Sequence, residues 1–429
     1  MKIIKKGASA TLALVAMAVN AHASPCENSY GEASSQINQA APLTLNGVIS
    51  EIRNVSPQVR AAALEARALA AEAEQAGRRL NPALTVEIEN FAGGGAFSNF
   101  NQSELTIALE QTFRLGRKRN LAHRAARARQ ALATAKCDLV LREAELEAAL
   151  LYAELTAAVR IHILASDAAT LSDTLTETVN KRVNAGAAAP PELARARADS
   201  AALKAAAIEA EAEIVRRRYA LAALWGSADP QFLSPQISSQ TFSSKPAEAN
   251  ISTHPRITAA EAAIRARAAD YEAAKAQSIP DITVAAGLRR FEGTGDNAIV
   301  AGFSLPLPLF DSNRGNIRAA DIRASASSAS RAAIEARLLA DQRAAISSVR
   351  AAENRLAVLT DEALPAAEEA YAAAIRGYAV GKFDLTTTLD ARAALINTRV
   401  AVIQASLNRQ TYDLRLRSLI GAAPFEGDK

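Results

Sequence analysis

Residues 81–91, which read Asn-Pro-Ala-Leu-Thr-Val-Glu-Ile-Glu-Asn-Phe, decide the fold class of this chain. Their apolar and polar side chains alternate with the two-residue period of a β-strand that has one apolar and one polar face. Residues 105–110 alternate in the same way after a glycine-rich loop, so we expect strands at 83–91 and 103–113. Such strands are typical of transmembrane barrels, although two hairpins in a soluble sheet would carry the same pattern.

The same series of landmarks occurs a second time along the chain. Asn81-Pro82 returns as Ile279-Pro280 at an offset of 198 residues, and Gly186 returns as Gly381 at an offset of 195. The landmarks keep their order and the offset changes by only three residues, which indicates an internal duplication. The second copy therefore predicts strands at 281–291 and 298–309.

This duplication divides the chain into six segments. They are a signal peptide at 1–23, an N-terminal extension at 24–53, a first repeat at 54–226, a linker at 227–253, a second repeat at 254–423 and a C-terminal tail at 424–429. Each repeat is expected to run helix, strand, loop, strand, long helix, tight turn and helix.

Long helices are expected between the strands and each tight turn. Residues 118–185 contain neither proline nor glycine, which predicts a helix of about 100 Å. The second repeat predicts a matching helix at 313–380, kinked near Pro365 because proline has no backbone N–H. Small residues spaced alternately three and four apart predict coiled-coil packing. A composition that is 49% hydrophobic but only 4% aromatic suits such close packing better than several compact cores.

The N-terminal residues predict export. Three lysines, an apolar run and the small-residue site at 21–23 are typical of a secretory signal peptide, cleaved after about Ala23. Without the three lysines of residues 1–23, 46 basic residues remain against 45 acidic ones, so nucleic acid is not expected as a partner. No later stretch has eighteen consecutive apolar residues, which predicts no membrane-spanning helix. Cys26 leaves two alternatives open, lipidation or a disulfide with Cys137.

Four strands set a condition on the oligomeric state. A closed barrel needs about eight strands, and open sheet edges are not tolerated in lipid. If the strands enter a membrane, the chain must therefore share its barrel with other copies. Two copies would supply eight strands and three would supply twelve, and the periodicity leaves both numbers open.

Several segments resemble the TolC outer-membrane efflux family, and more narrowly its CzcC-like branch for heavy-metal cation export. The similar segments are residues 81–91, 111–119, 289–297, 305–311 and 377–385. The resemblance extends from residue 43 to residue 423, over nearly all of the exported chain. One departure is the first turn, at 186–191, which lacks the Thr and Ser residues of the family's turns, whereas residues 386–388 keep them.

The resemblance implies a mainly α fold with a small β part, in which a long coiled-coil helical barrel adjoins a twelve-stranded β-barrel shared by a homotrimer. It implies a place in the outer membrane of a Gram-negative bacterium, with a long periplasmic extension. The expected partners are a periplasmic adaptor, an inner-membrane proton-driven pump of the resistance-nodulation-division type and outer-membrane lipids. The expected cargo is a heavy-metal cation such as cobalt, zinc or cadmium. The alternatives are drug or protein export by the same fold, or a non-transporting periplasmic coiled-coil scaffold.

Two groups of candidate site residues lie near the turns, about 100 Å of helix away from the strands. The residues expected to dock the adaptor are Gly186, Pro190, Val380, Gly381, Asp384, Leu385 and Thr386. Those expected to form a periplasmic gate are Arg182, Arg376, Tyr378, Asp384 and Asp390. Solvated surface charges are the alternative interpretation of the gate residues.

Charges near the strands suggest two further roles. Glu87, Glu89 and Glu110 fall on the polar strand face, where carboxylates would line a lumen and concentrate cations, or would simply be solvated. The basic residues between 114 and 129 favour a collar near lipid phosphates over a nucleic-acid patch. No catalytic or cofactor motif is present, and the four histidines are too far apart in sequence to predict a metal site. We therefore expect neither an enzyme nor a cofactor.

Overall fold

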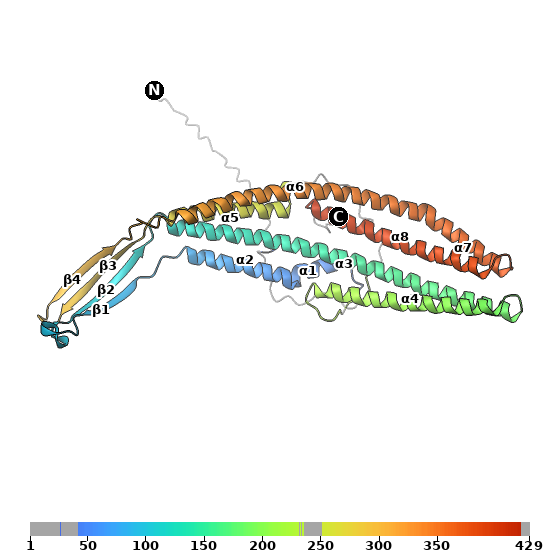
Figure 1. The fold of residues 1–429 in the computed structure, drawn as a ribbon, viewed down its shortest axis with the longest axis horizontal. Helices are drawn as coiled ribbons and strands as arrows, with labels where there is room; N and C mark the ends of the chain where they lie inside the picture. The colour runs from blue at the N-terminus through green and yellow to red at the C-terminus, as the bar shows by residue number, and fades with distance from the viewer. Residues whose placement is uncertain (1–25, 27–41, 231, 233, 236–250, 422–429) are drawn as a thin grey trace, which may run out of the picture.

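A computed structural model describes residues 26, 42–230, 232, 234, 235 and 251–421 of the chain. The predicted signal peptide, its cleavage site, most of the linker and the C-terminal tail lie outside these residues. The described chain is elongated, with a small sheet at one end and the helix turns at the other (Figure 1). Short 3₁₀ turns occur at Gly95–Phe97, Asn99–Gln102 and Ile251–Thr253.

The described residues form one antiparallel sheet of four strands, in the order β1-β2-β3-β4. The strands are β1 (Ala83–Glu89), β2 (Glu104–Phe113), β3 (Ile282–Phe291) and β4 (Asn297–Ser304). The sequence-based end of the fourth strand at residue 309 was wrong, because Pro306 and Pro308 cannot donate to a ladder. The first strand also ends early, because Asn90 takes a left-handed conformation with φ 54°. Since β1 and β4 each pair on one side only, both sheet edges are open.

The first repeat contains α2 (Pro57–Ala76), α3 (Lys118–Asn184) and α4 (Pro190–Ala223). The second contains α5 (Pro255–Ala276), α6 (Arg314–Val358), α7 (Leu364–Ala379) and α8 (Leu385–Leu419). A π-helical turn at Leu359–Ala363 separates α6 from α7, immediately before Pro365. The predicted kink is therefore a break in the α-helical hydrogen bonding, which Pro365 cannot continue. The same order of elements in both halves confirms the duplication.

The first helix, α1 (Leu45–Val55), crosses the predicted boundary between the extension and the first repeat. That boundary at residues 53 and 54 was wrong. The helix begins at Thr44, whose side chain accepts a hydrogen bond from the Gly47 amide at 3.1 Å. It buries Val48 and Ile52 in a cluster that includes Leu155, Trp225, Phe232 and Leu414. Because this cluster draws on both repeats, α1 helps to hold them together.

A disulfide joins Cys26 to Cys137 of α3, with 6.1 Å between the Cα atoms. The bond uses the thiol that lipidation would need, so the structure favours the disulfide alternative. A second contact joins the residues before α1 to α3: the Tyr152 hydroxyl donates to the Leu43 carbonyl at 3.1 Å. The segment before α1 is thus attached to α3 at two points.

Helix α3 contains an 18-residue stretch of mean hydropathy 1.4, which by length and composition alone could span a membrane. Half of that stretch is buried inside the protein. Leu141, Ala148 and Leu155 of α3 belong to the same buried cluster as α1. The apolar stretch is therefore explained by packing within the helical part.

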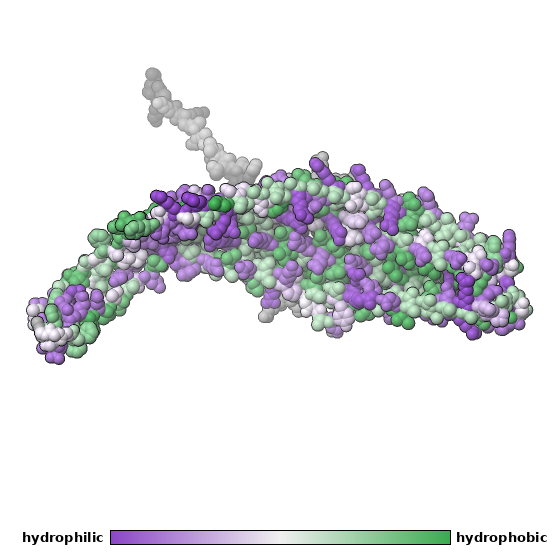
Figure 2. All heavy atoms as spheres, viewed as in Figure 1, coloured by the Kyte–Doolittle hydropathy of each residue, from purple (hydrophilic) through white to green (hydrophobic). Residues whose placement is uncertain are grey.

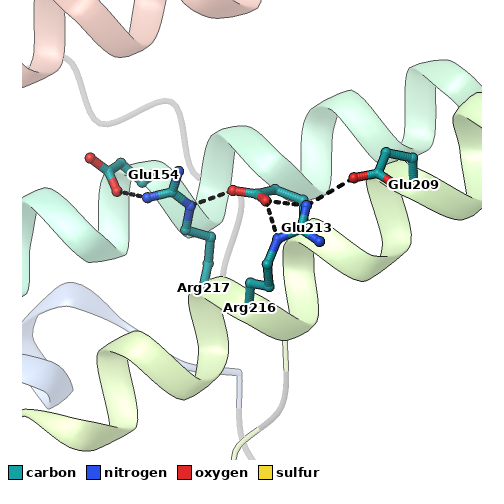
Figure 3. Close-up of polar contacts among 5 residues, drawn as sticks. All are labelled: Glu154, Glu209, Glu213, Arg216 and Arg217. Carbon is teal, nitrogen blue, oxygen red and sulfur yellow. Dashed lines mark hydrogen bonds and ion pairs between the residues drawn. The ribbon is translucent and has the colours of Figure 1, made fainter.

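An ion-pair network joins the middle of α3 to the C-terminal part of α4 (Figure 3). Arg217 of α4 pairs with Glu154 of α3 and, at 2.6 Å, with Glu213. Arg216 pairs with Glu213 at 2.6 Å and with Glu209 at 3.1 Å. The hydrogen bond from Arg217 is the main cause of the lowered pKa of Glu213. Because these side chains are partly exposed, the network sets the register of the two helices more than it stabilises them.

Candidate functional site

The two faces of the sheet differ sharply in polarity. One row of paired residues, Val86, Ile107, Leu288 and Ile299, crosses all four strands on the same face. Their exposed fractions run from 48% to 83%. Leu84, Ile88, Leu109, Val284 and Phe303 are also exposed on this face. So large an apolar surface is unusual on a soluble sheet and is typical of the lipid-facing side of a barrel.

On the opposite, polar face, Arg289 lies near the C-terminal end of β3. Its guanidinium pairs with Glu89 at 2.8 Å and Glu104 at 2.9 Å, and donates to the Thr106 hydroxyl at 2.9 Å. Of the predicted lumen carboxylates, Glu89 is therefore paired and Glu87 is exposed. Glu110 accepts a hydrogen bond from Thr85 at 3.0 Å.

The polar face of the four strands carries a net charge of −3. It has four carboxylates, on Glu87, Glu89, Glu104 and Glu110, and one guanidinium, on Arg289. Sequence reasoning missed Glu104 and Arg289, although the two-residue period places both on this face. The surface attracts cations without forming a site: among the described residues, no group of three His, Cys, Asp or Glu side chains is arranged to hold a metal ion.

Two tight turns lie at the far end of the helices (Figure 1). Gly186 has a φ of 69° and Gly381 a φ of 74°. In each turn the following amide bonds back at 2.8 Å to a carbonyl five residues earlier, from Ala187 to Arg182 and from Lys382 to Gly377. This left-handed end of a helix favours glycine, because a Cβ atom would be strained there.

The helices leaving the two turns begin with different caps. Helix α4 begins at Pro190, and the Glu192 carboxylate accepts from the Ala189 amide at 3.3 Å. Helix α8 begins after Asp384, whose carboxylate accepts from the Thr387 amide at 2.8 Å. The hydrogen bond from Thr387 is the main cause of the lowered pKa of Asp384. Because both starts are fixed by caps, the turns are short and defined.

Contacts between the two turns involve Arg182 and Tyr378, two of the predicted gate residues. The Arg182 guanidinium donates to the Tyr378 carbonyl and lies 4.6 Å from the centre of the Tyr378 ring. The Tyr378 hydroxyl donates to Glu192 of α4 at 3.3 Å. Thr386 accepts from Arg195 at 2.9 Å. These bonds join the turn of the first repeat to that of the second within one chain.

The other predicted tip and gate residues divide by exposure. Val380 is 79% exposed, whereas Leu385 is 2% exposed and packs with Tyr378 and Leu175. Leu385 therefore supports the tip from inside. Arg376 and Asp390 are exposed, and the structure does not bring them together in an ion pair within the part of the chain that it describes.

An ion pair with a buried arginine lies behind the tip and escaped sequence reasoning. Arg392 of α8 is 3% exposed and pairs with Asp199 of α4. Asp199 also accepts from the Ser172 hydroxyl of α3 at 3.2 Å. No local pattern signals this pair, because its members are 193 residues apart. The pair joins the helices of the second repeat to those of the first.

Two of the predicted basic collar residues have acidic partners where the sheet meets the helices. Lys118 is buried and bonds to Asp281 at 2.7 Å. Arg129 pairs with Asp270 at 2.6 Å. These two residues fix the start of α3 against the second repeat.

Two of the histidines make local contacts in the helical part. His254 is buried and caps α5, and the His162 ring nitrogen Nδ1 lies 3.3 Å from the Ala207 carbonyl.

Residues 48–227 and 248–422 match the outer membrane efflux protein family. The chain belongs to this family. It is 30% identical over 375 residues to the cobalt-zinc-cadmium resistance protein CzcC of Cupriavidus metallidurans, covering 84% of this chain and 86% of CzcC. It is 31% identical over 309 residues to the nickel and cobalt resistance protein CnrC of the same species, covering 70% of this chain and 72% of CnrC.

Solved structures share the fold. CusC superposes with a TM-score of 0.77 at 18% identity, over 88% of this chain and 92% of CusC. The outer membrane protein VceC of Vibrio cholerae has a TM-score of 0.74 at 23% identity, over 88% of this chain and 96% of VceC. The predicted family and the TolC-like fold class are thus confirmed. The protein is an outer membrane efflux channel, and its relatives are channel proteins rather than enzymes.

Proposed function

We propose that this protein is the exit duct of a tripartite efflux system of the resistance-nodulation-division type, and that it releases heavy-metal cations through the outer membrane. The observation that carries the proposal is the four-stranded sheet, with an exposed apolar face, a polar face of net charge −3 and two open edges. Only a barrel shared between chains satisfies all three features in lipid.

A homotrimer is the proposed assembly. The open edge of β1 can pair in antiparallel fashion with the open edge of β4 from another chain. Three chains then supply twelve strands. Two chains would supply eight, which also suffices for closure. The resemblance to the TolC family favours three. The outward face would then be the apolar row of Val86, Ile107, Leu288 and Ile299.

Heavy-metal cations are the proposed cargo on two grounds. The relatives carry cobalt, zinc, cadmium and nickel resistance in their names. The polar face of each chain has an excess of three carboxylates, and rings of carboxylates favour cation passage. A duct has to release its cargo, so this function needs no tight metal site.

The tip is proposed to meet the periplasmic adaptor, which links the duct to the inner-membrane pump. Gly186 and Gly381 keep the turns short, and the exposed Val380 is available for contact. Arg376 and Asp390 are exposed, so we propose that they pair between chains around the closed end. This arrangement requires export, for which the predicted signal peptide at residues 1–23 provides.

The proposal is tested with a deletion strain and its complemented control. Sensitivity to cobalt, zinc, cadmium, nickel, copper and silver is measured, and crosslinking of native membranes gives the oligomeric state. We expect a metal-sensitive deletion strain, restored by the wild-type chain, and a crosslinked trimer in the outer membrane fraction. Sensitivity to drugs alone would support the drug-export alternative, and a monomer in native membranes would exclude the shared barrel.

A further inference from the structure

A hollow of about 600 Å³ lies where the sheet joins the helices. Hydrophilic side chains gather over this junction in Figure 2. Three parts of the first repeat line the hollow: the segment after α2, the end of β2 and the start of α3. The arginines that line it are Arg78, Arg79, Arg114, Arg117 and Arg119.

The hollow is strongly and unusually positive. No acidic residue lines it, and its other lining residues are Leu80, Gln111, Thr112, Phe113 and Asn120. Within the part of the chain that the structure describes, none of the five arginines forms an ion pair. Lys118 and Arg129, from the same basic segment, both have carboxylate partners. Five guanidinium groups that line one hollow favour an anion among them.

The start of α3 adds to the positive potential. Its N-cap residue, Arg117, makes no side-chain capping bond. The Lys118 amide bonds to the Leu115 carbonyl at 3.3 Å, but no capping side chain supplies an acceptor for the next amides of the helix. The helix dipole adds partial positive charge there. The side chains of Gln111 and Thr112 give the wall neutral polar groups.

The second repeat shows what this junction looks like without the charges. Arg117 and Asn313 both precede a long helix in a left-handed conformation, with φ of 59° and 58°. Asparagine is a common residue there, and arginine is not. At the offset of 198 that relates α2 to α5, Arg78 and Arg79 correspond to Ala276 and Gln277. The arginines are thus not required by the fold of the junction.

The hollow lies directly beyond the apolar face of the sheet, on the helix side. Phe113, at the end of β2, lines the hollow and is 51% exposed. Leu80 also lines it and is 39% exposed. An arginine cluster bordered by apolar side chains matches the level at which lipid phosphates meet acyl chains.

We propose that this hollow binds the phosphate group of an anionic phospholipid from the periplasmic leaflet of the outer membrane. The ligand is a phosphodiester with a net negative charge, and a trimer would hold three, one at each first repeat. This inference rests on the membrane placement given under the proposed function. It adds a defined lipid site that the second repeat lacks.

The test uses the full-length trimer in nanodiscs with equal amounts of phosphatidylglycerol and phosphatidylcholine. Trimers are released in mild detergent, and the retained lipids are identified and counted by mass spectrometry. The test variant, Arg78→Ala with Arg79→Gln and Arg117→Asn, has the residues of the second repeat. The control variant, Arg318→Ala with Arg323→Ala and Arg343→Ala, removes the same charge from exposed positions of α6.

We expect the wild type and the control to retain phosphatidylglycerol preferentially. The test variant should bind it roughly fivefold more weakly for each arginine removed, from the usual strength of a basic residue near lipid. Retention without preference in the wild type, or unchanged preference in the test variant, would overturn the proposal. Displacement of the lipid by inorganic phosphate at equal concentration would also overturn it, in favour of a free-phosphate site.

Metal resistance of the same strains separates this proposal from the exit-duct function. We expect the test variant to keep resistance while losing its lipid preference. A wild-type chain that retains the lipid but confers no resistance would contradict the duct function and leave the lipid site supported.

Discussion

At the scale of single residues, a few backbone conformations define the tip. Gly381 has a φ of 74°, and an added Cβ atom would lie 3.5 Å from the Arg182 guanidinium. The space there is open, so the constraint is the left-handed backbone rather than a clash. Any other residue is strained by about 1–2 kcal/mol and would also extend from the tip.

We predict that Gly381→Trp abolishes metal resistance while the amount of trimer stays normal. The large side chain would occupy the surface that the adaptor is proposed to contact. Gly295→Trp is the matched control, because Gly295 has a φ of 73° and open space around it but lies in the loop between β3 and β4. Resistance and trimer abundance are measured together. Full resistance in Gly381→Trp would show that the tip does not dock an adaptor end to end.

His254 gives the protein a pH-dependent stability at the residue scale. Its Nδ1 accepts from the Arg256 amide at 3.1 Å, and its Nε2 lies 3.2 Å from the Ser418 carbonyl. These two contacts require a neutral ring protonated on Nε2. Burial lowers the pKa of His254 below its usual value of 6.5, and the charge of Arg256 acts in the same direction.

We predict that the wild type loses stability as the pH falls below about 6.5, because the unfolded chain binds a proton that folded His254 resists. His254→Asn keeps a capping side chain and removes this titration. Thermal unfolding of the trimer at about pH 7.5 and about pH 5.5 measures the effect. The unfolding temperature of the wild type should fall more between the two pH values than that of His254→Asn. An equal fall in both proteins would assign the pH dependence to other groups.

At the scale of elements, strand register decides which side chains meet lipid. Ile107 lies in the middle of the apolar row and is 48% exposed. Thr85 lies on the opposite face, paired with Ala108 and bonded to Glu110. A shift of register by one residue would exchange these two environments.

We predict that Ile107→Arg and Val284→Arg impair membrane assembly and that Thr85→Arg is tolerated. A cation on the lipid face near the middle of the bilayer costs roughly 2–4 kcal/mol, whereas the polar face is hydrated. The amount of folded trimer in outer membranes measures assembly. The reverse order of effects would place Thr85 on the lipid side.

Much of the element scale could be predicted from the sequence, and the failures have physical causes. Alternation located all four strands, because both faces of each strand have distinct surroundings. The end of β4 was misplaced because apolar residues continue past Ser304 where Pro306 and Pro308 prevent pairing. Helix α1 was missed because it follows no repeated landmark. Long-range partners such as Arg392 and Asp199 were not foreseeable, since no local pattern relates positions 193 residues apart.

At the scale of the whole molecule, ion pairs join the two repeats at several points along the helical part. The pair between Arg392 and Asp199 joins α8 to α4 near the tip, and its arginine is 3% exposed. A change in the relative position of the repeats near the tip has to break it. The pair is therefore placed to resist such a movement of the turns.

We predict that Asp199→Asn raises the passive entry of vancomycin while trimer abundance stays normal. The change leaves Arg392 without a charged partner and weakens the contact of α8 with α4 and α3. Glu368→Gln is the matched control, because Glu368 pairs with Arg399 but both side chains are well exposed, at 48% and 39%. Antibiotic susceptibility is the measurement. Equal susceptibility of both variants would mean that the buried pair does not hold the tip closed.

The open edges of β1 and β4 also govern how the protein is made. A newly exported subunit presents two unpaired strand edges and an apolar face before it meets other copies. Such edges bind one another without regard to order, so free subunits are prone to aggregate. Productive assembly then depends on keeping the pool of unassembled chains small, through chaperones or through insertion as fast as delivery. We therefore expect the rate of synthesis, as well as the stability of the finished barrel, to limit how much channel a cell can accumulate.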